Sequence, residues 1–360
     1  AGPTDTHWLG GDGSFFTTGK WSDGVPGTYE KPGPTYNGFS LTQFTGPSYF
    51  WSEMTINSGT AEISPGIRLV YNIIGVPDER YSTYDYVDSF QLPTAVIGES
   101  GHGGLSITEG IYVGFQNLTL GGQPGSSGTM TSTGPPKSGA ILNFGAAGDM
   151  VVGSGGIGRL NLLQGSSAHF PDQVYQRGNT INVWTSKVGE KPGSNGYITI
   201  NGPGSRYAYS ELFFDELHKT TGFFIGEGGV GGVKIENGGS MKTRAARVGA
   251  RSTGEGFLSV TGTGSRFDND AQLLIGEYGK GSLSITNGGL VRSGYGDFWL
   301  GTTVALEPVD PILIFTDYGS IGKYAGSEGS VLVNGSTSRW ENNANLVVGE
   351  SGKGSLAIEG

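Results

Sequence analysis

A chain of 360 residues with a formal net charge of −10 and no cysteine excludes several classes of protein. Proteins that bind nucleic acid carry clustered Lys and Arg, so this acidic balance excludes that partner. Without cysteine there is no disulfide framework, thiolate chemistry or cysteine-based zinc site. No apolar run of about 18 residues is present to span a membrane.

Glycine is the commonest residue, with 68 of the 360 positions, against about 7% in an average protein. The glycines have no collagen period, and the apolar residues between them alternate regularly. A disordered Gly-rich chain would lack such Val, Ile, Leu and aromatic runs. We therefore expect a folded chain whose glycines occupy turns, where a positive φ is needed.

Residues 1–94 differ from the rest of the chain. Trp8 and the segment that begins at Trp21 lie among Gly, Ser, Asp and Pro, which predicts short strands joined by tight turns. The end of a repeat array needs a cap that shields its open edge. We assign residues 1–94 to an N-terminal cap and the first irregular coils. A start at Ala1 suits a processed N-terminus.

An insertion at residues 71–93 is rich in tyrosine and acidic residues. Candidate partner-binding residues within it are Tyr81, Tyr84, Asp85, Tyr86 and Asp88. Tyrosine supplies a large contact area at a small entropic cost and is enriched at recognition surfaces. The alternative is that this loop only covers the edge of a coil.

From residue 95 onward the chain repeats one phrase. Its clearest copies are residues 223–239, 273–289 and 346–360, and weaker copies begin at Ala95, Met150 and Val188. The related positions Ile225, Val248 and Ile275 are 23 and 27 residues apart, a length that suits one coil of a solenoid. A unit this short cannot bury its own apolar face, so its copies must stack. Residues 95–360 are therefore predicted to form one continuous solenoid.

Within each copy, apolar side chains stand at i and i+2, as in Leu283 and Ile285, which is the period of a strand. The Asn-Gly that follows is ordinarily a hairpin signal, and hairpins would give a β-sandwich. Stacked coils explain the fixed spacing better, because each position then lies above its own copy. We predict an all-β parallel β-helix with loop insertions. Its core should contain Ile225, Ile235, Ile275, Leu283, Ile285, Val331, Val333, Val348 and Leu356.

Two further insertions interrupt the solenoid. Residues 210–219 suggest a short amphipathic helix with Ser210 as N-cap. Phe213 and Phe214 are partner-binding candidates there. Residues 302–317 form the other insertion. The last copy stops at Gly360 in mid-unit, so we expect the native chain to continue.

Catalytic and metal-binding motifs are mostly absent. Gly-x-Ser-x-Gly is missing, and the four histidines, His7, His102, His169 and His218, are scattered. Two Gly-x-Gly-x-x-Gly matches, at residues 153–158 and 226–231, lie inside the repeat and not between a strand and a helix. We expect no catalytic residue, no metal site and no cofactor. The acidic pair Asp268 and Asp270, and Asp215 with Glu211 and Glu216, leave open a carbohydrate-active enzyme.

The repeat resembles that shared by bacterial autotransporter (type V secretion) passenger domains and PEP-CTERM surface proteins. Its phrase is Leu-x-Ile-Gly-x-x-Gly-x-Gly-Ser-Leu-x-Ile-x-Asn-Gly-Gly, alternating with Gly-Ser-x-x-Trp/Phe-x-Asn, and the Trp21 opening is also similar. The resemblance implies a right-handed parallel β-helix displayed on, or released from, the outer membrane, with a C-terminal translocator barrel beyond this segment. The absence of cysteine agrees with passage of an unfolded chain across that membrane.

The function expected from the sequence is non-enzymatic. The chain would be a virulence-associated passenger that binds a host cell-surface protein or glycan, either as an adhesin or as a released effector. Self-association of bacterial cells, a carbohydrate-active enzyme and a purely structural stalk are the alternatives.

Overall fold

The computed structural model describes residues 6–15, 17–22, 35–36, 39–40, 54–63, 88–108, 111–134, 141–144, 149–170, 185–209, 222–295 and 318–360. These residues are almost entirely strands. One short 3-10 helix, η1 (Thr18–Lys20), is the only helix among them. No helix in this part of the chain is long and apolar enough to cross a membrane.

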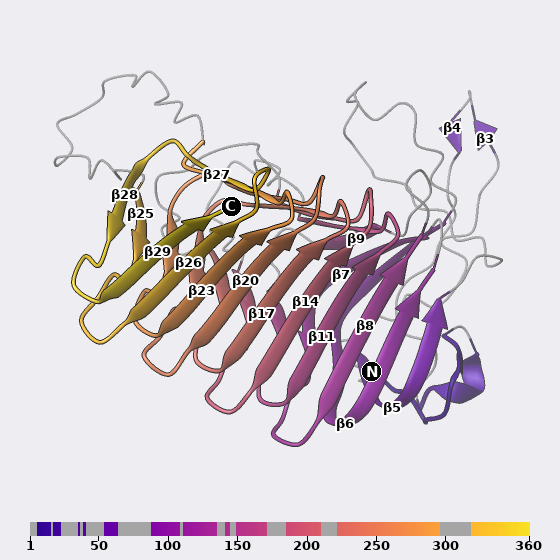
Figure 1. The fold of residues 1–360 in the computed structure, drawn as a ribbon. Coiled ribbons are helices and arrows are strands. Elements are labelled where there is room, and N and C mark those ends of the chain that lie inside the picture. Colours follow the sequence, from indigo (N-terminus) through magenta and orange to yellow (C-terminus); the bar gives the residue numbers. More distant parts are fainter. Residues whose placement is uncertain are drawn as a thin grey trace, which may run out of the picture.

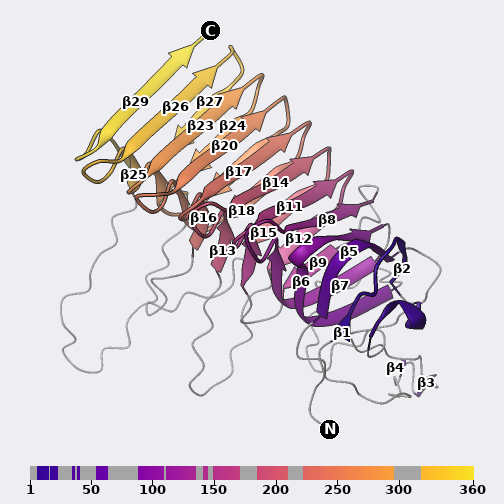
Figure 2. The same ribbon diagram turned by 90° about the horizontal axis from the view of Figure 1, so that it is seen from below.

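The strands stack as coils in a fixed order. One coil consists of β22 (Leu273–Ile275), β23 (Lys280–Thr286) and β24 (Leu290–Ser293). Each strand pairs in parallel with its counterpart in the preceding and following coils. The result is three columns of parallel strands running the length of the molecule (Figures 1 and 2). The structure is a parallel β-helix, as predicted.

The columns are defined here by the strands that they contain. Besides β22, the first column includes β10 (Met150–Val152), β13 (Thr185–Val188), β16 (Gly222–Ile225), β19 (Ala246–Val248), β25 (Tyr318–Ile321) and β28 (Asn345–Val348). With β23, the second includes β8 (Ser127–Thr133), β11 (Ile157–Leu163), β14 (Asn195–Asn201), β17 (Val230–Glu236), β20 (Glu255–Thr261), β26 (Glu328–Asn334) and β29 (Lys353–Glu359). With β24, the third includes β9 (Ile141–Phe144), β12 (Ser167–Phe170), β15 (Arg206–Tyr209), β18 (Ser240–Thr243), β21 (Arg266–Asn269) and β27 (Arg339–Asn342).

Three longer strands begin the stack and pass through its corners without a break. These are β5 (Met54–Ile63), β6 (Asp88–Ile107) and β7 (Ile111–Leu120), and their pairings are parallel. The parallel register thus already includes β5, within the segment assigned to the cap and first coils. The division at residue 94 itself stays a prediction. Among the described residues, antiparallel pairing is confined to β3 (Thr35–Tyr36) with β4 (Phe39–Ser40) and the Trp8–Trp21 bridge.

The Asn-Gly turns join consecutive strands of one coil and do not form hairpins. Asn237 and Asn287 both have φ of 53°, and Gly238 and Gly288 follow with φ of 85° and 86°. Positive φ at both central residues is the conformation that Asn-Gly accommodates most readily. The hairpin reading of the β-sandwich alternative is therefore wrong, because the flanking strands pair with neighbouring coils and not with each other.

At another corner the coils approach so closely that only glycine fits. Gly226 has φ of 65°, and a Cβ there would lie 2.3 Å from the carbonyl oxygen of Glu255 in the next coil. A Cβ on Gly231 would lie 2.3 Å from the carbonyl oxygen of Val188 in the preceding coil. Both positions recur in successive coils. The glycine-rich phrase therefore reflects close backbone stacking.

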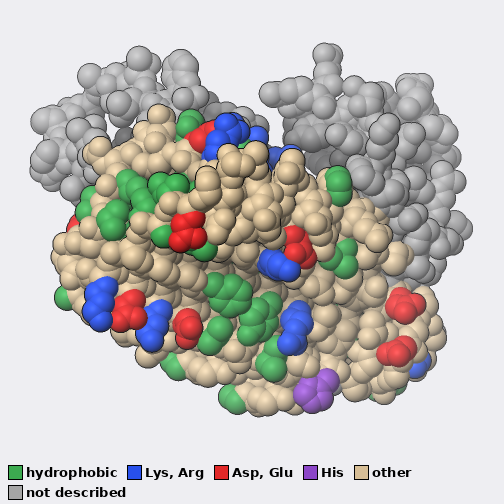
Figure 3. Space-filling view, viewed as in Figure 1, with side chains coloured by type: hydrophobic (Ala, Val, Ile, Leu, Met, Phe, Trp, Pro, Cys, Tyr) green, Lys and Arg blue, Asp and Glu red, His purple; other side chains and the backbone are tan. Residues whose placement is uncertain are grey.

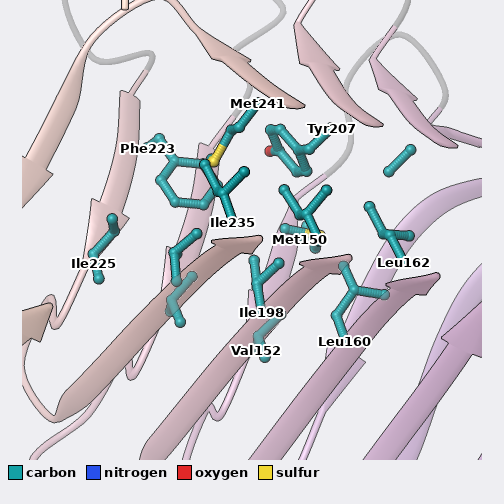
Figure 4. Close-up of a cluster of buried hydrophobic side chains, with 14 of the residues drawn as sticks. Met150, Val152, Leu160, Leu162, Ile198, Tyr207, Phe223, Ile225, Ile235 and Met241 are labelled. Atoms are coloured by element: carbon teal, nitrogen blue, oxygen red, sulfur yellow. The ribbon is translucent and has the colours of Figure 1, made fainter. Parts of the chain in front are cut away.

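The core is a set of apolar ladders between the columns (Figure 4). Seven of the nine predicted core residues are buried: Ile225, Ile235, Ile275, Leu283, Ile285, Val331 and Val333. The prediction is wrong for Val348 and Leu356, which are 46% and 37% exposed. They belong to β28 and β29, which have a neighbouring coil on one side only.

A polar ladder runs inside the third column. Thr243 Oγ1 donates to Asn269 Oδ1 at 2.9 Å, and Ser293 Oγ donates to Asn342 Oδ1 at 2.8 Å. Asn269 Nδ2 also donates to the carbonyl oxygen of Ala271 at 2.8 Å. Asn therefore stacks alternately with Thr or Ser, which satisfies polar groups that burial would otherwise penalise.

An aromatic cluster closes the first coil. Trp21 makes edge-to-face contacts with Trp8 and Phe15, at 5.1 and 5.0 Å between ring centres. Trp21 Nε1 donates to the carbonyl oxygen of Phe15 at 2.7 Å. Strands β1 (Thr6–His7) and β2 (Gly13–Ser14) pair with β5 and extend the sheet by one incomplete coil.

We predict that Ile285→Asp destabilises the chain by more than about 4 kcal/mol, because it buries an unpaired charge between the apolar side chains of Val260 and Val333 in the adjacent coils. Ser284→Asp is the matched control, since Ser284 points outward from the same strand. Urea unfolding of both variants, followed by circular dichroism, measures the difference. An unfolding midpoint for Ile285→Asp equal to that of the control would contradict the core assignment.

Candidate binding surface

Most of the predicted partner-binding residues lie outside the described residues. This is true of Tyr81, Tyr84, Asp85, Tyr86, Phe213 and Phe214. Asp88 is the first residue of β6. Segment 64–87 connects β5 to β6, and segment 210–221 connects β15 to β16. The end of β5 lies in the second column and the start of β6 in the third, so segment 64–87 connects these two columns. Segment 210–221 connects the third column to the first. The two insertions therefore leave the solenoid at different corners, and their binding role stays a prediction.

The acidic pair of the enzyme alternative is engaged by cations. Asp268 lies on β21, with a carboxylate oxygen 2.5 Å from Arg266 Nε. Asp270 follows that strand, 3.5 Å from Lys242 Nζ. Burial raises the pKa of Asp270 above its ordinary value, against the attraction of Lys242. Both carboxylates thus serve local ion pairs. The other cluster, Asp215 with its acidic neighbours, lies outside the described residues.

His102 lies on the exposed outer face of β6, with Nδ1 2.9 Å from Ser127 Oγ in the next coil. Within the described ranges, no group of three or more His, Cys, Asp or Glu residues could hold a metal ion.

The recurring Glu of the Gly-Glu turns forms a ladder of ties between coils. Lys187 Nζ lies 2.9 Å from Glu190 Oε1 and 3.6 Å from Glu227 Oε2 in the next coil. Arg251 NH2 donates to Glu227 Oε1 at 2.8 Å. Glu277 Oε1 lies 3.6 Å from Arg247 NH1. The side chains of Glu190, Glu227 and Glu277 are only 20%, 6% and 6% exposed, so their carboxylates tie neighbouring coils together at this corner.

Two members of this ladder have pKa values shifted in opposite directions. Burial raises the pKa of Glu277, and Arg247 and Lys323 only partly offset it. Burial also acts to raise the pKa of Glu190, but hydrogen bonds from Lys187 and Ser154 outweigh it and leave that pKa lowered. Hydrogen bonds to the ionised form therefore determine whether burial raises or lowers the pKa of each glutamate.

The second column presents a long outer face to solvent. Its strands alternate buried and outward residues, and the outward ones are mostly Ser, Thr, Asn and charged side chains. Figure 3 shows hydrophobic side chains gathered near the middle of this face, over β14 to β20, with basic side chains beside them.

One row of this face contains three large side chains, Arg159, Tyr197 and Phe257, which we call the aromatic strip. In the register of the column, Arg159 lies between Thr129 and Tyr197. Gly232 separates Tyr197 from Phe257. The strip was missed in the sequence because its residues are 38 and 60 positions apart. Aligning the phrase copies reveals it, since each member directly follows the second-position glycine of its strand.

Comparison with known proteins adds no argument to the strand pairing described above. No family model matches the chain, and no curated protein matches it. A solved structure, the crystal structure of a TibC-catalyzed hyper-glycosylated TibA55-350 fragment, is similar with 14% identity and a TM-score of 0.15. The match covers 86% of this chain and 90% of that one. A TM-score this low carries no argument, so the fold is established by the strand pairing described above.

We predict opposite pH responses for the two glutamates. Glu190, with a lowered pKa, stabilises the fold above its unfolded pKa of about 4.3, and this is lost as pH falls through its folded pKa. Glu277, with a raised pKa, favours the fold when protonated, and this is lost as pH rises from about 4.3 through its folded pKa.

Urea midpoints of Glu190→Gln and Glu277→Gln, measured against the parent from about pH 7 to pH 3, check this prediction. Relative to the parent, Glu190→Gln should lose stability at neutral pH and recover it on acidification. Glu277→Gln should gain at neutral pH and lose that gain on acidification. Parallel pH profiles for the two variants would contradict the assigned shifts.

Proposed function

We propose that this chain is a non-enzymatic passenger of autotransporter type, displayed on a bacterial surface or released from it, that binds host cells. The observation that carries the proposal is a parallel β-helix, built from the repeat phrase, whose described strands from β5 to β29 all pair with neighbouring coils. Its outer positions vary between copies while its glycines and core residues recur. Such a scaffold offers extended lateral faces for binding.

The repeat phrase and the Trp21 opening supply the class of protein. Their resemblance to autotransporter passengers supports a surface or secreted location and a translocator barrel beyond this segment. The ion pairs of Asp268 and Asp270 favour structural roles for these carboxylates. Turnover of a polysaccharide that Asp268→Asn abolishes would instead establish the enzyme alternative.

Two modes of host binding remain distinct. An adhesin would use the lateral faces of the solenoid while it is attached to the bacterium. A released effector would dock an insertion, such as the loop with Tyr81, Tyr84 and Tyr86, onto one receptor. The proposal covers both, with a cell-surface protein or glycan as the partner.

A second candidate function, self-association, is favoured by one feature of the second column. Its outer row reads Glu255, Lys280, Glu328, Lys353 in successive coils. This alternation is self-complementary, because an antiparallel copy would set each Lys against a Glu. An isologous contact of this kind is the commonest route to a dimer.

We predict saturable binding of the purified, fluorescently labelled chain to cultured mammalian cells. A variant with residues 78–87 replaced by a Gly-Ser linker tests the effector mode, because it removes three predicted contact tyrosines. Flow cytometry measures both. Loss of binding in this variant places the site in the insertion, whereas retained binding moves it to the solenoid or another loop.

The control is a variant in which residues 304–313, from another insertion, are replaced by the same linker. Absence of saturable binding by the parent chain on every cell line tested would contradict the proposed function.

For self-association, we predict that Lys280→Glu weakens any dimer, because it makes three consecutive positions of the row acidic. Lys191→Glu is the charge-matched control, since the side chain of Lys191 is 63% exposed at a corner outside this row. Sedimentation velocity over a concentration series compares the two variants with the parent. A monomeric parent at all concentrations would remove this candidate.

A further inference from the structure

The aromatic strip on the second column is not explained by folding. Phe257 is 38% exposed, although its strand, β20, already buries its inward side chains in the core. The part of this apolar ring that stays in contact with water gains no free energy from burial. Its position therefore points to contact with something outside the molecule.

The backbone shapes the strip. Gly232 has no side chain, and the ring of Phe257 occupies the space above it: a Cβ on Gly232 would lie 2.1 Å from Phe257 Cζ. The ring thereby reaches across one strand to Tyr197, with 6.1 Å between ring centres and a tilt of 45°. The two rings form one apolar platform that spans β14 to β20.

A cation ends the platform. The guanidinium carbon of Arg159 lies 5.7 Å from the centre of the Tyr197 ring. Among the described residues, no carboxylate makes an ion pair with Arg159. Lys234 and Lys353 on the same face are paired, with Glu236 at 2.5 Å and with Glu328 at 3.2 Å. Arg159 can therefore direct its N–H groups to an external anion.

Hydroxyl and amide groups surround the platform. Apart from Ile157, Glu255 and Lys234, the outward neighbours along the same strands and their register partners include Thr129, Thr131, Asn161, Asn195, Thr199 and Ser259. These side chains both donate and accept hydrogen bonds. Asn161 Nδ2 already donates to Thr131 Oγ1 at 3.2 Å, which fixes the orientation of that amide.

We propose that the aromatic strip binds an acidic oligosaccharide. The C–H face of a sugar ring would lie on Tyr197 and Phe257, and the carboxylate of a sialic or uronic acid would bind Arg159 in a bidentate pair. Ring hydroxyls would meet the surrounding Thr, Ser and Asn. One cation without an ion pair, close to a group of hydroxyl and amide side chains, matches a ligand with one carboxylate.

This inference rests on the proposed function, because it names the class of host ligand for a lateral face. Two sources supply the same chemistry, sialylated glycans and uronic-acid polymers. The experiment separates them by using a sialyllactose and a hyaluronan tetrasaccharide as probes, with lactose as the uncharged reference. Isothermal titration calorimetry of the full chain measures affinity.

We expect one of the acidic probes to bind more tightly than lactose. Arg159→Gln should lower that affinity about tenfold or more, the size of one lost charge-assisted pair, and bring it to the level of lactose. Phe257→Ser should weaken binding of both acidic and neutral sugars. Gly232→Ala should also weaken binding, because its Cβ displaces the Phe257 ring without removing any strip side chain.

Tyr278→Ser is the matched control. Tyr278 is 48% exposed and stacks on Tyr324 at 4.2 Å, so this variant removes an exposed aromatic residue outside the strip. Its affinity should equal that of the parent, and circular dichroism checks that each variant is folded. Two results would overturn the inference: no binding of either acidic probe at millimolar concentration, or equal affinity in Arg159→Gln and the parent. Cell binding that persists in these variants would refute this site and leave the proposed function intact.

Discussion

Parallel backbone hydrogen bonding between successive coils is the constraint on which the rest of the structure depends. Every strand from β8 to β26 of the second column has a neighbour on both sides, in a register without slips. That register places each side chain above its counterpart in the adjacent coil. A one-residue slip would turn the whole apolar set outward. The apolar ladders, the polar ladder and the ion-pair ladder are all consequences of one shared register.

Close approach of the coils explains why glycine recurs where it does. At Gly226 and Gly231 a methyl group would collide with the backbone of an adjacent coil. The relaxation available to a flexible side chain is not available to a backbone that is itself paired on both sides. Glycine costs entropy at such positions, and the ladders that close stacking permits offset this cost.

The fold could be predicted from the sequence because these constraints act at fixed positions of a repeated phrase. Ile225, Ile235 and Ile285 could be assigned to the core from their period and their copies alone. Val348 is exposed, because burial in a solenoid requires a coil on each side and β28 pairs only with β25 among the described strands. The Asn-Gly turns were ambiguous for a related reason: their dihedral angles are the same whether the flanking strands pair with each other or with neighbouring coils.

The candidate surface was far less predictable. Outward positions obey no packing rule, so Arg159, Tyr197 and Phe257 look unremarkable when the phrase is read along the chain. They become neighbours only through the register of the second column. The sequence prediction placed the binding site in an insertion because Tyr81, Tyr84 and Tyr86 are close together in sequence. In a solenoid, however, one coil of sequence separates residues that lie one strand apart in space. The residues of a lateral site are therefore distributed over several copies of the repeat.

This geometry also bears on how such a chain can acquire specificity. A change at one outward position, such as Gly232, alters the space available to the ring of the next coil without disturbing the core. The backbone pairing of adjacent strands fixes the coil spacing and hence the distance between side chains on the outer face, and ties at the corners, such as Glu227 with Arg251, join the same coils. Strands in adjacent coils lie about 4.8 Å apart, so a ligand as long as a few sugar rings would span the strip from Arg159 to Phe257. Binding energy on a flat face of this kind is spread over several coils. The rigidity of the scaffold lowers the entropic cost of holding the binding side chains of these coils in place together.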